Sequence, residues 1–408
     1  MSKTETPSIR FRGFEDAWEQ RKLGEMGQTY TGLSGKTKDD FGHGQARFVT
    51  YMNVFSNPIS NPEMTEPIEI DPKQNEVEVG DVFFTTSSET PEEVGMSSIL
   101  LEKRGKTYLN SFCFGFRPSE KIDSYYLAYM LRSESTRAKV ILLAQGISRY
   151  NISKNKVMEI AVSLPSLDEQ KMIGQYFSQL DNLITLHQRK VEKLTNVKKS
   201  MLEKMFPQNG SSYPEIRFKG FTDLWEQRKF GEITSKYEDP VPTPHDGYYR
   251  LGIRSHAKGT FHSYVAKGQE LETAQMHRVA AGNFIVNITF GWEHAVAITD
   301  KNDAGKLVSH RFPQFSFAEG MVPEFFRYVI VDEKFRHHLW LASPGGAGRN
   351  RVLKLDEMLN YLMRFPSRDE QIKIAEFFRQ LDNLITLHQR ELEKLQNIKK
   401  SLLEKMFV

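Results

Sequence analysis

The chain has 408 residues, of which 39% are apolar and 26% charged, and its formal net charge is +3. This length accommodates two or three domains, the small charge does not by itself indicate nucleic-acid binding, and no apolar run approaches the roughly 18 residues of a membrane span. The N-terminal segment MSKTETPSIR has no apolar core of a secretory signal, and the single Cys113 cannot form an internal disulfide. We therefore expect a cytoplasmic protein without a membrane partner.

Catalytic and metal-binding motifs are absent from the sequence. The 11 histidines show no HExxH or Cys/His spacing. The segments SGKT at 34–37 and RGKT at 104–107 resemble the end of a phosphate-binding loop, but Tyr30 and Leu100 stand where its first glycine is required. We predict no catalytic residue, no metal and no cofactor in this chain, and a protein that binds and positions.

In chain order, the block IRFRGFEDAWEQRKLGE at 9–25 comes first, and a stretch of mixed α/β character follows at 26–160. In that stretch ARFVTYMNVF, DVFFTT and FCFGF are rich in the β-branched and aromatic residues typical of strands, and DSYYLAYMLRS suits a short helix. Polar loops lie between these segments. We predict a first globular domain at 1–162.

A long helix is predicted next, within a segment at 163–207. Asp168, shortly after Pro165, favours a helix start, and residues 170–206 would extend over about 55 Å at 1.5 Å per residue. The apolar positions step by four and three residues, which is the period of a coiled-coil seam. The seam positions expected to pack on a partner helix are Phe177, Leu180, Ile184 and His187.

The remainder of the chain repeats this plan. IRFKGFTDLWEQRKFGE at 216–232 repeats the opening block, and QLDNLITLHQR at 179–189 returns letter for letter at 380–390. The stretch between the blocks barely matches, although VGDVFF at 79–84 and AGNFIV at 281–286 are faint echoes of each other. The sequence is therefore a duplication of a whole domain with its helix, and not a solenoid of short repeats.

The duplication predicts a linker at 208–215, a second globular domain at 216–363 and a second helical segment at 364–408. The equivalent seam positions are Phe378, Leu381, Ile385 and His388. Because each helix follows its own domain, we expect an antiparallel helix pair with a pseudo-twofold axis and one domain at each end. The predicted fold class is mixed α/β (α+β): two globular domains separated by an antiparallel pair of long coiled-coil helices.

Polar residues interrupt the seam in both copies, at His187 and Lys198 and again at His388 and Lys399. A polar group at a seam position can fix the register of the two helices at a cost in stability. Alternatively, the lysine ammonium groups reach water and the histidines are tolerated. The second interpretation is favoured.

The repeated blocks resemble those of the specificity (S, HsdS) subunit of type I restriction-modification systems. The resemblance rests on RFxGFxxxWEQRKxGE at the start of each half, and on PSxDEQ leading into LDNLITLHQR and EKLxNxKKSxLEKMF. It covers the whole chain, in both copies and in order. It implies two target-recognition domains that each read one half of a split double-stranded DNA sequence, with the helices setting the gap between the halves.

The resemblance also implies partners. Two methylation (M) subunits carry the S-adenosylmethionine site and modify adenine at N6, and two restriction (R) subunits use ATP and Mg to cut DNA. Neither catalytic site belongs to the specificity subunit. This agrees with the absence of catalytic motifs in the sequence.

Candidate DNA-contacting residues come from loops rich in Gly, Arg, Asn, Gln and Ser, because glycine permits close approach and the others bond base edges or phosphates. The segments 170–207 and 371–408 carry a net charge of +6 and the rest of the chain −3, so contacts outside the helices need local patches. The loop at 345–354 departs from the family pattern at Arg351, where Asn or Ser is expected. The candidates are Gln145, Ser148, Arg149, Tyr150, Asn151 and Lys154; Arg349, Asn350, Arg351 and Lys354; and Thr85, Ser87, Asn287 and Thr289.

Two other functions remain open. A scaffold whose coiled coil joins two protein- or ligand-binding domains would show no salt-sensitive DNA binding. A self-sufficient DNA enzyme would need an active site within one of the two variable domains.

Overall fold

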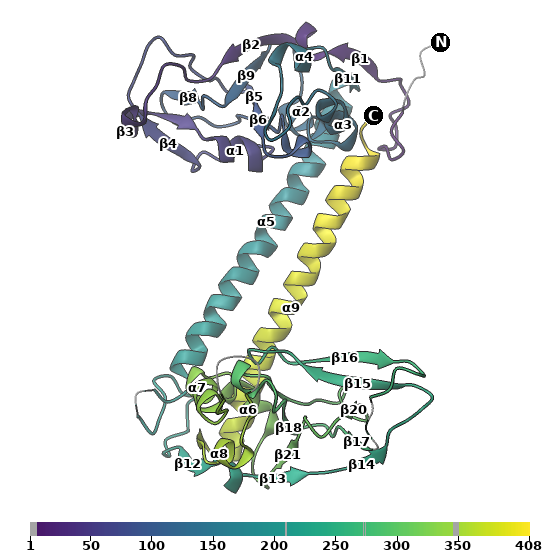
Figure 1. The fold of residues 1–408 in the computed structure, drawn as a ribbon. Coiled ribbons are helices and arrows are strands. Elements are labelled where there is room, and N and C mark those ends of the chain that lie inside the picture. The colour runs from purple at the N-terminus through teal and green to yellow at the C-terminus, as the bar shows by residue number, and fades with distance from the viewer. Residues whose placement is uncertain (1–5, 209, 272, 274, 346–350) are drawn as a thin grey trace. The chain divides into compact units, whose positions relative to one another are not determined.

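The computed structural model describes residues 6–208, 210–271, 273, 275–345 and 351–408 (Figure 1). The chain divides into two compact units. Unit 1 consists of residues 1–189 and 388–408, and unit 2 consists of residues 190–387. The long helices α5 (Leu167–Lys204) and α9 (Arg368–Lys405) each contribute residues to both units.

Unit 1 is built on small sheets. A four-stranded sheet has the order β2-β9-β5-β7, a three-stranded sheet has the order β4-β3-β8, and two pairs are β1-β11 and β6-β10. The strands are β1 (Glu19–Lys22), β2 (Gly27–Thr31), β3 (Phe41–Val49), β4 (Thr65–Ile68), β5 (Val82–Thr85), β6 (Ser87–Ser88), β7 (Ser97–Ile99), β8 (Thr107–Leu109), β9 (Cys113–Pro118), β10 (Tyr150–Asn151) and β11 (Ala161–Leu164).

Unit 2 has a related set. Its four-stranded sheet has the order β13-β21-β18-β19, a five-stranded sheet has the order β14-β17-β20-β15-β16, and β12 pairs with β22. The strands are β12 (Glu226–Lys229), β13 (Thr234–Tyr237), β14 (Pro240–Pro242), β15 (Tyr248–Ile253), β16 (Thr260–Val265), β17 (Gln275–Arg278), β18 (Phe284–Val286), β19 (Val296–Ile298), β20 (Leu307–Val308), β21 (Gln314–Phe317) and β22 (Leu362–Phe365).

Short helices accompany the sheets. Side chains of Asp123, Ser133 and Asp332 accept hydrogen bonds from backbone N–H groups in the first turns of α2, α3 and α7 and so cap them. The short α-helices are α1 (Tyr51–Ser56), α2 (Ser124–Met130), α3 (Glu134–Ile141), α4 (Lys154–Met158), α6 (Pro323–Val329), α7 (Glu333–Leu341) and α8 (Leu355–Leu359). The 3-10 turns are Leu23–Glu25, Lys38–Asp40, Pro91–Glu93, Phe230–Glu232 and Gly291–Glu293.

The two domains share a topology that their sequences barely reveal. In each unit one strand pair is parallel, β3 with β8 in unit 1 and β15 with β20 in unit 2. Gly80 and Gly282, from the faint sequence echoes, both adopt a left-handed φ, +97° and +81°, just before β5 and β18. The echoes therefore mark equivalent strands, and the predicted mixed α/β class with two β-rich domains is confirmed.

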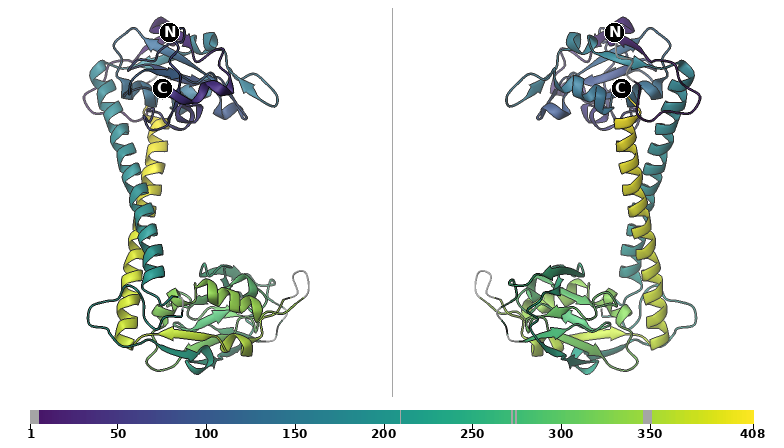
Figure 2. Two further views of the ribbon diagram at one scale, coloured as in Figure 1. Left: turned by 90° about the vertical axis from the view of Figure 1, so that its left-hand side faces the viewer. Right: turned by 90° about the vertical axis from the view of Figure 1, so that its right-hand side faces the viewer.

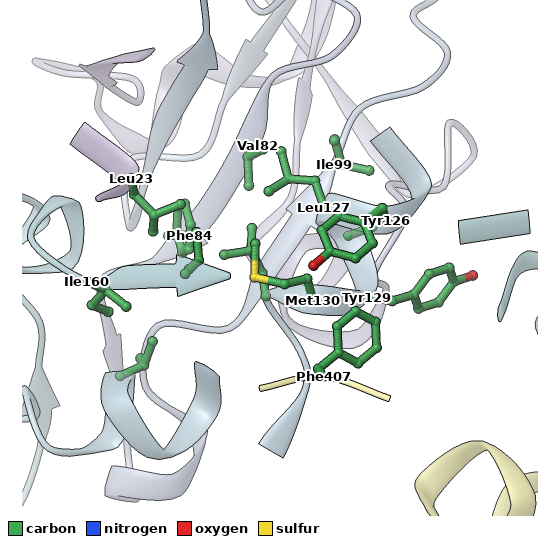
Figure 3. Packing of buried hydrophobic residues seen from close by; sticks show 14 of the residues in the cluster. Leu23, Val82, Phe84, Ile99, Tyr126, Leu127, Tyr129, Met130, Ile160 and Phe407 are labelled. Atoms are coloured by element: carbon green, nitrogen blue, oxygen red, sulfur yellow. The ribbon is translucent and has the colours of Figure 1, made fainter. Parts of the chain in front are cut away.

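The core of unit 1 joins the domain to the helices. Phe177 of α5 is fully buried and stacks on Tyr129 of α2, with ring centroids 5.1 Å apart. Phe407, just beyond α9, packs on Phe177 and on Tyr126, with centroids 5.6 Å apart in both cases. Figure 3 shows Phe407 beside Tyr126 and Tyr129 in this cluster. Burying each aromatic ring contributes about 1.5–3 kcal/mol, so this cluster fastens both helices to the domain.

The core of unit 2 repeats this arrangement. Phe378 of α9 is fully buried, and Phe206, just beyond α5, packs on it with a centroid distance of 6.0 Å. Phe206 also stacks on Phe325 of α6 at 5.7 Å. Leu381 is buried as well, and Ile385 is half-buried.

Within each unit the parts of α5 and α9 lie side by side and run in opposite directions (Figure 2). In unit 1, Asp181 contacts Lys399 and His187 contacts His388, so the residue number rises along one helix as it falls along the other. In unit 2, Lys198 contacts Asp382. The predicted packing of the two long helices on each other is therefore confirmed, and it is antiparallel.

The seam lysines remain partly exposed, but each also pairs with a carboxylate of the other helix, which the favoured interpretation did not include. Lys399 Nζ donates to Asp181 Oδ1 at 2.5 Å, and Tyr129 Oη of α2 donates to Asp181 Oδ2 at 2.8 Å. Burial, followed by the charge of Asp181, raises the pKa of Tyr129, so its phenol stays protonated as a donor. The equivalent trio in unit 2 is Lys198, Asp382 and Tyr328, with distances of 2.6 and 3.0 Å. The ammonium groups pair here because each seam position faces a carboxylate of the other helix.

Candidate nucleic-acid interface

Two candidate segments of unit 1 that lie about sixty residues apart in sequence form one surface. Strand β10 pairs antiparallel with β6, with Tyr150 opposite Ser88 and Asn151 opposite Ser87. The backbone of Asn151 also exchanges two hydrogen bonds with Gln145, at 2.9 and 3.0 Å. A small ladder thus holds the loop at 144–156 against the segment after β5.

The tip of this loop is exposed. Gly146 has a φ of +146°, and a Cβ built there would lie 2.0 Å from the carbonyl oxygen of Arg149, so the turn requires glycine. Gln145, Ser148, Arg149 and Asn151 are exposed, whereas Tyr150 and Lys154 are half-buried. Within the described part of the chain, no hydrogen bond or ion pair involves the Arg149 guanidinium. It is available to a phosphate or a base edge.

The candidates Thr85, the last residue of β5, and Ser87, the first residue of β6, are both buried. Thr85 is fully buried, and its hydroxyl oxygen accepts a hydrogen bond from Met96 N at 3.0 Å. Ser87 is 5% exposed, and its carbonyl oxygen accepts from Tyr51 Oη at 2.7 Å. Ser87 is therefore part of the ladder itself, and Thr85 lies in the buried strand β5 that leads into it.

Unit 2 has the same junction with different side chains. Leu353 N donates to Ile288 O at 2.9 Å, as Ile152 N donates to Thr86 O at 2.9 Å in unit 1. Asn287 Oδ1 accepts from Thr289 N at 3.0 Å and so shapes the turn after β18. These two residues are half-buried, and Lys354 is exposed. The candidates Arg349 and Asn350 lie outside the described residues.

Arg351 lies among aromatic rings. Its guanidinium carbon is 4.9 Å from the ring centroid of Trp340 and 6.0 Å from that of Trp292, distances typical of cation–π contacts. Trp340 is 42% exposed, so one face of this cluster is open to solvent. The cluster presents a planar cation held between two indoles.

The comparisons with known proteins agree with one another. The family model described as "Type I restriction modification DNA specificity domain" matches residues 15–196. The putative type I restriction enzyme MjaX specificity subunit of Methanocaldococcus jannaschii is 22% identical over 95% of this chain and 92% of its own. The type I restriction enzyme MjaVIII specificity subunit of the same organism is 25% identical over 75% of this chain and 74% of its own. The chain belongs to the family of type I restriction-modification DNA specificity subunits.

The similarity extends to the fold. The crystal structure of the type I restriction-modification S subunit from M. genitalium superposes with a TM-score of 0.61, at 12% identity, over 99% of both chains. The family model ends at residue 196, and the internal repeat carries the same framework into the second half of this specificity subunit. As a specificity subunit, the chain is itself non-catalytic and is one component of a larger restriction-modification complex.

Sequence reasoning missed part of the candidate interface of this specificity subunit. Trp340 and His337, whose rings stack at 6.0 Å, are not among the candidates, and Trp292 lies at the end of the segment 287–292 that supplies Asn287 and Thr289. Because Trp340 lies just before a glycine-rich segment, the sequence could have indicated it as a candidate for the interface. The contact of Arg351 with Trp340 has no such signal in the sequence, because only the tertiary fold brings the two residues together.

The described residues contain no group of three or more His, Cys, Asp or Glu side chains placed to hold a metal ion. Among the described helices, none has a stretch long and apolar enough to cross a membrane.

Proposed function

We propose that each domain of this specificity subunit, at 1–162 and at 216–363, reads one half of a bipartite double-stranded DNA target. The observation that carries the proposal is the pair of equivalent loop junctions, Ile152 with Thr86 and Leu353 with Ile288. The backbone connection is the same in both units, but the side chains around it differ. Two reading surfaces of different specificity on one framework would recognise an asymmetric, split sequence.

In unit 1 the ladder holds the exposed loop in place before DNA arrives, which reduces the ordering cost of binding. Arginine and asparagine are suited to bidentate contacts with guanine and adenine. The proposed DNA-contacting residues are Gln145, Ser148, Arg149, Tyr150, Asn151 and Lys154 in unit 1 and Asn287, Thr289, Arg349, Asn350, Arg351 and Lys354 in unit 2. Thr85 and Ser87 would act by supporting the ladder.

The long helices offer a docking surface for methylation subunits. Leu183 and Leu186 of α5 are 43% and 46% exposed, and the equivalent Leu384 and Leu387 of α9 are 43% and 51% exposed. Apolar side chains repeated at the same exposed positions fit a helical partner that covers them. Two copies of the surface would take two methylation subunits, which would hold S-adenosylmethionine, and two restriction subunits with ATP and Mg would complete the complex. The single cysteine, Cys113, fits an assembly that works in the reducing cytoplasm.

The test is a map of methylated adenines from cells that express the chain with its methylation subunits, read by single-molecule sequencing. Arg149→Ala combined with Asn151→Ala should relax or abolish recognition of one half-site by at least about tenfold, since a good base contact contributes 1–3 kcal/mol. Arg351→Ala should affect the other half-site. Arg104→Ala, an exposed arginine paired with Glu63 in unit 1, is the control and should change neither.

The proposal fails if the two loop variants alter the same half-site, or if both leave the recognised sequence unchanged. A general loss of methylation in the Arg104→Ala control would show that the methylation map reports the folding of the chain and not its recognition of the DNA sequence.

The helices would set the number of unread base pairs between the half-sites, because a continuous helix holds spacing better than a flexible linker. Inserting one helical turn into 171–206 and the matching turn into 372–407 adds about 6 Å to each helix. The gap should then lengthen by about one to two base pairs while both half-sites stay the same. An unchanged gap in the methylation map would reject this role.

A further inference from the structure

Two histidines face each other where α5 and α9 pack in unit 1. His187 Nδ1 and His388 Nδ1 are 3.3 Å apart, and the ring centroids are 5.1 Å apart with the planes inclined at 74°. Both side chains are half-buried. Each residue is the counterpart of the other in the internal repeat. An antiparallel pair of like helices brings a residue to its own counterpart only at the centre of its contact, and here that residue is histidine.

The separation of the two nitrogens matches the spacing of metal ligands. Two ligands at about 2.0–2.1 Å from a tetrahedral zinc ion are separated by about 3.3–3.4 Å. A hydrogen bond between the two rings fits the same distance, and titration with metal distinguishes it from a shared ion.

We propose that His187 and His388 form a binding site for a first-row divalent transition metal ion, with zinc, nickel and copper as the candidates. Imidazole nitrogen suits all three of these ions. Since the described residues hold no larger group of ligating side chains, water would complete the coordination shell. With two protein ligands where structural zinc sites have four, the dissociation constant should be on the order of 10 µM.

An ion at this position would join α5 to α9 at one point of their seam. The Asp181–Lys399 pair already fixes the register nearby in unit 1, at 2.5 Å, so the ion would add a second link between the same two helices. The site exists only when the helices are paired. Binding would therefore stabilise the folded chain in proportion to the ion concentration, and this inference is independent of how the domains read DNA.

The test is isothermal titration calorimetry on the full-length chain, prepared without a histidine tag. ZnCl₂ and, in a separate experiment, NiCl₂ are titrated into the protein. The chain should bind one ion at about 10 µM, and His187→Gln or His388→Gln should weaken binding at least tenfold. His43→Gln removes a histidine that is 57% exposed in another part of unit 1 and should leave the affinity unchanged. X-ray absorption of the zinc-loaded chain should show two imidazole ligands.

A second measurement guards against misfolded variants. The thermal midpoint without metal should be similar in all the proteins, and excess zinc should raise it in the unaltered chain and in His43→Gln but not in the other two. No binding by the unaltered chain would leave a direct hydrogen bond between the rings as the explanation and overturn the proposal. Equal binding by the double variant His187→Gln/His388→Gln would also overturn it.

Discussion

The same polar contacts recur inside each of the two units, although most of the sequence differs between the units. Arg10 forms two hydrogen bonds with Glu169, at 2.7 and 2.8 Å, and Arg217 forms two with Glu370, both at 2.7 Å. The two carboxylates are almost completely buried, and the hydrogen bond to Glu169 raises the pKa of Arg10. Each pair ties the opening block of a half to the start of the long helix that ends the same half.

Other framework contacts recur as closely. Gln170 accepts from Asp123 N and donates to Pro165 O, and Gln371 does the same with Val322 N and Pro366 O. The strand pairs β1-β11 and β12-β22 have the same register. The Arg–Glu and glutamine contacts are made by side chains, so these residues cannot change without loss of the contact.

The variable regions are built differently. The equivalent sheets and loop junctions are held by backbone hydrogen bonds, which most residue types can make. Unit 2 extends its second sheet with β14 and β17 without disturbing the shared strands. A framework of side-chain contacts thus maintains the architecture, while backbone hydrogen bonds leave the side chains of the variable loops free to change.

The largest expected effect is on the buried Arg–Glu pairs. Glu169→Ala and Glu370→Ala would each leave a mostly buried guanidinium without its partner, which costs about 3 kcal/mol of folding free energy. If the two units share one framework, the two losses should agree within about 1 kcal/mol. Urea denaturation of the purified variants measures this.

Glu192→Ala, an exposed position on α5, is the matched control and should change the free energy of unfolding by less than about 0.5 kcal/mol. If one of the two glutamate variants lost much of its free energy of unfolding and the other lost almost none, the two Arg–Glu pairs would not stabilise their units equally.

A smaller effect is expected where the units differ by one residue. Gly95 in unit 1 and His294 in unit 2 occupy equivalent turns with a left-handed φ of +63° and +62°. Burial lowers the pKa of His294 below its usual 6.5, although its ring nitrogen Nε2 contacts Ile330 O at 2.7 Å. The unfolded chain therefore binds this proton more readily, and the free energy of unfolding should decrease as the pH falls below about 6.5.

His294→Gly suits the left-handed turn and removes the titrating group. Denaturation at pH 7.5 and at pH 5.5 should show a smaller loss of stability on acidification in this variant than in the unaltered chain. The same loss in both proteins would mean that other groups carry the pH dependence and that this difference between the units has no energetic consequence.

The sequence alone determined the duplication, the mixed α/β class and the long helices. A periodic pattern such as Phe177, Leu180 and Ile184 is local information, because residues three and four apart share one face of a helix. Such a face must be buried, and the second copy supplied a matching partner. The family blocks are contiguous in the chain and could be recognised without a structure.

Tertiary structure decided which distant residues meet. The pairing of Asn151 with Ser87, the burial of Thr85 and the contact of Arg351 with Trp340 each join segments that no local pattern connects. The seam lysines show the same limit, since periodicity placed Lys399 on the helix face but not Asp181 opposite it. Spacing along the chain specifies which side of an element a residue occupies, whereas its partner depends on how the whole chain packs.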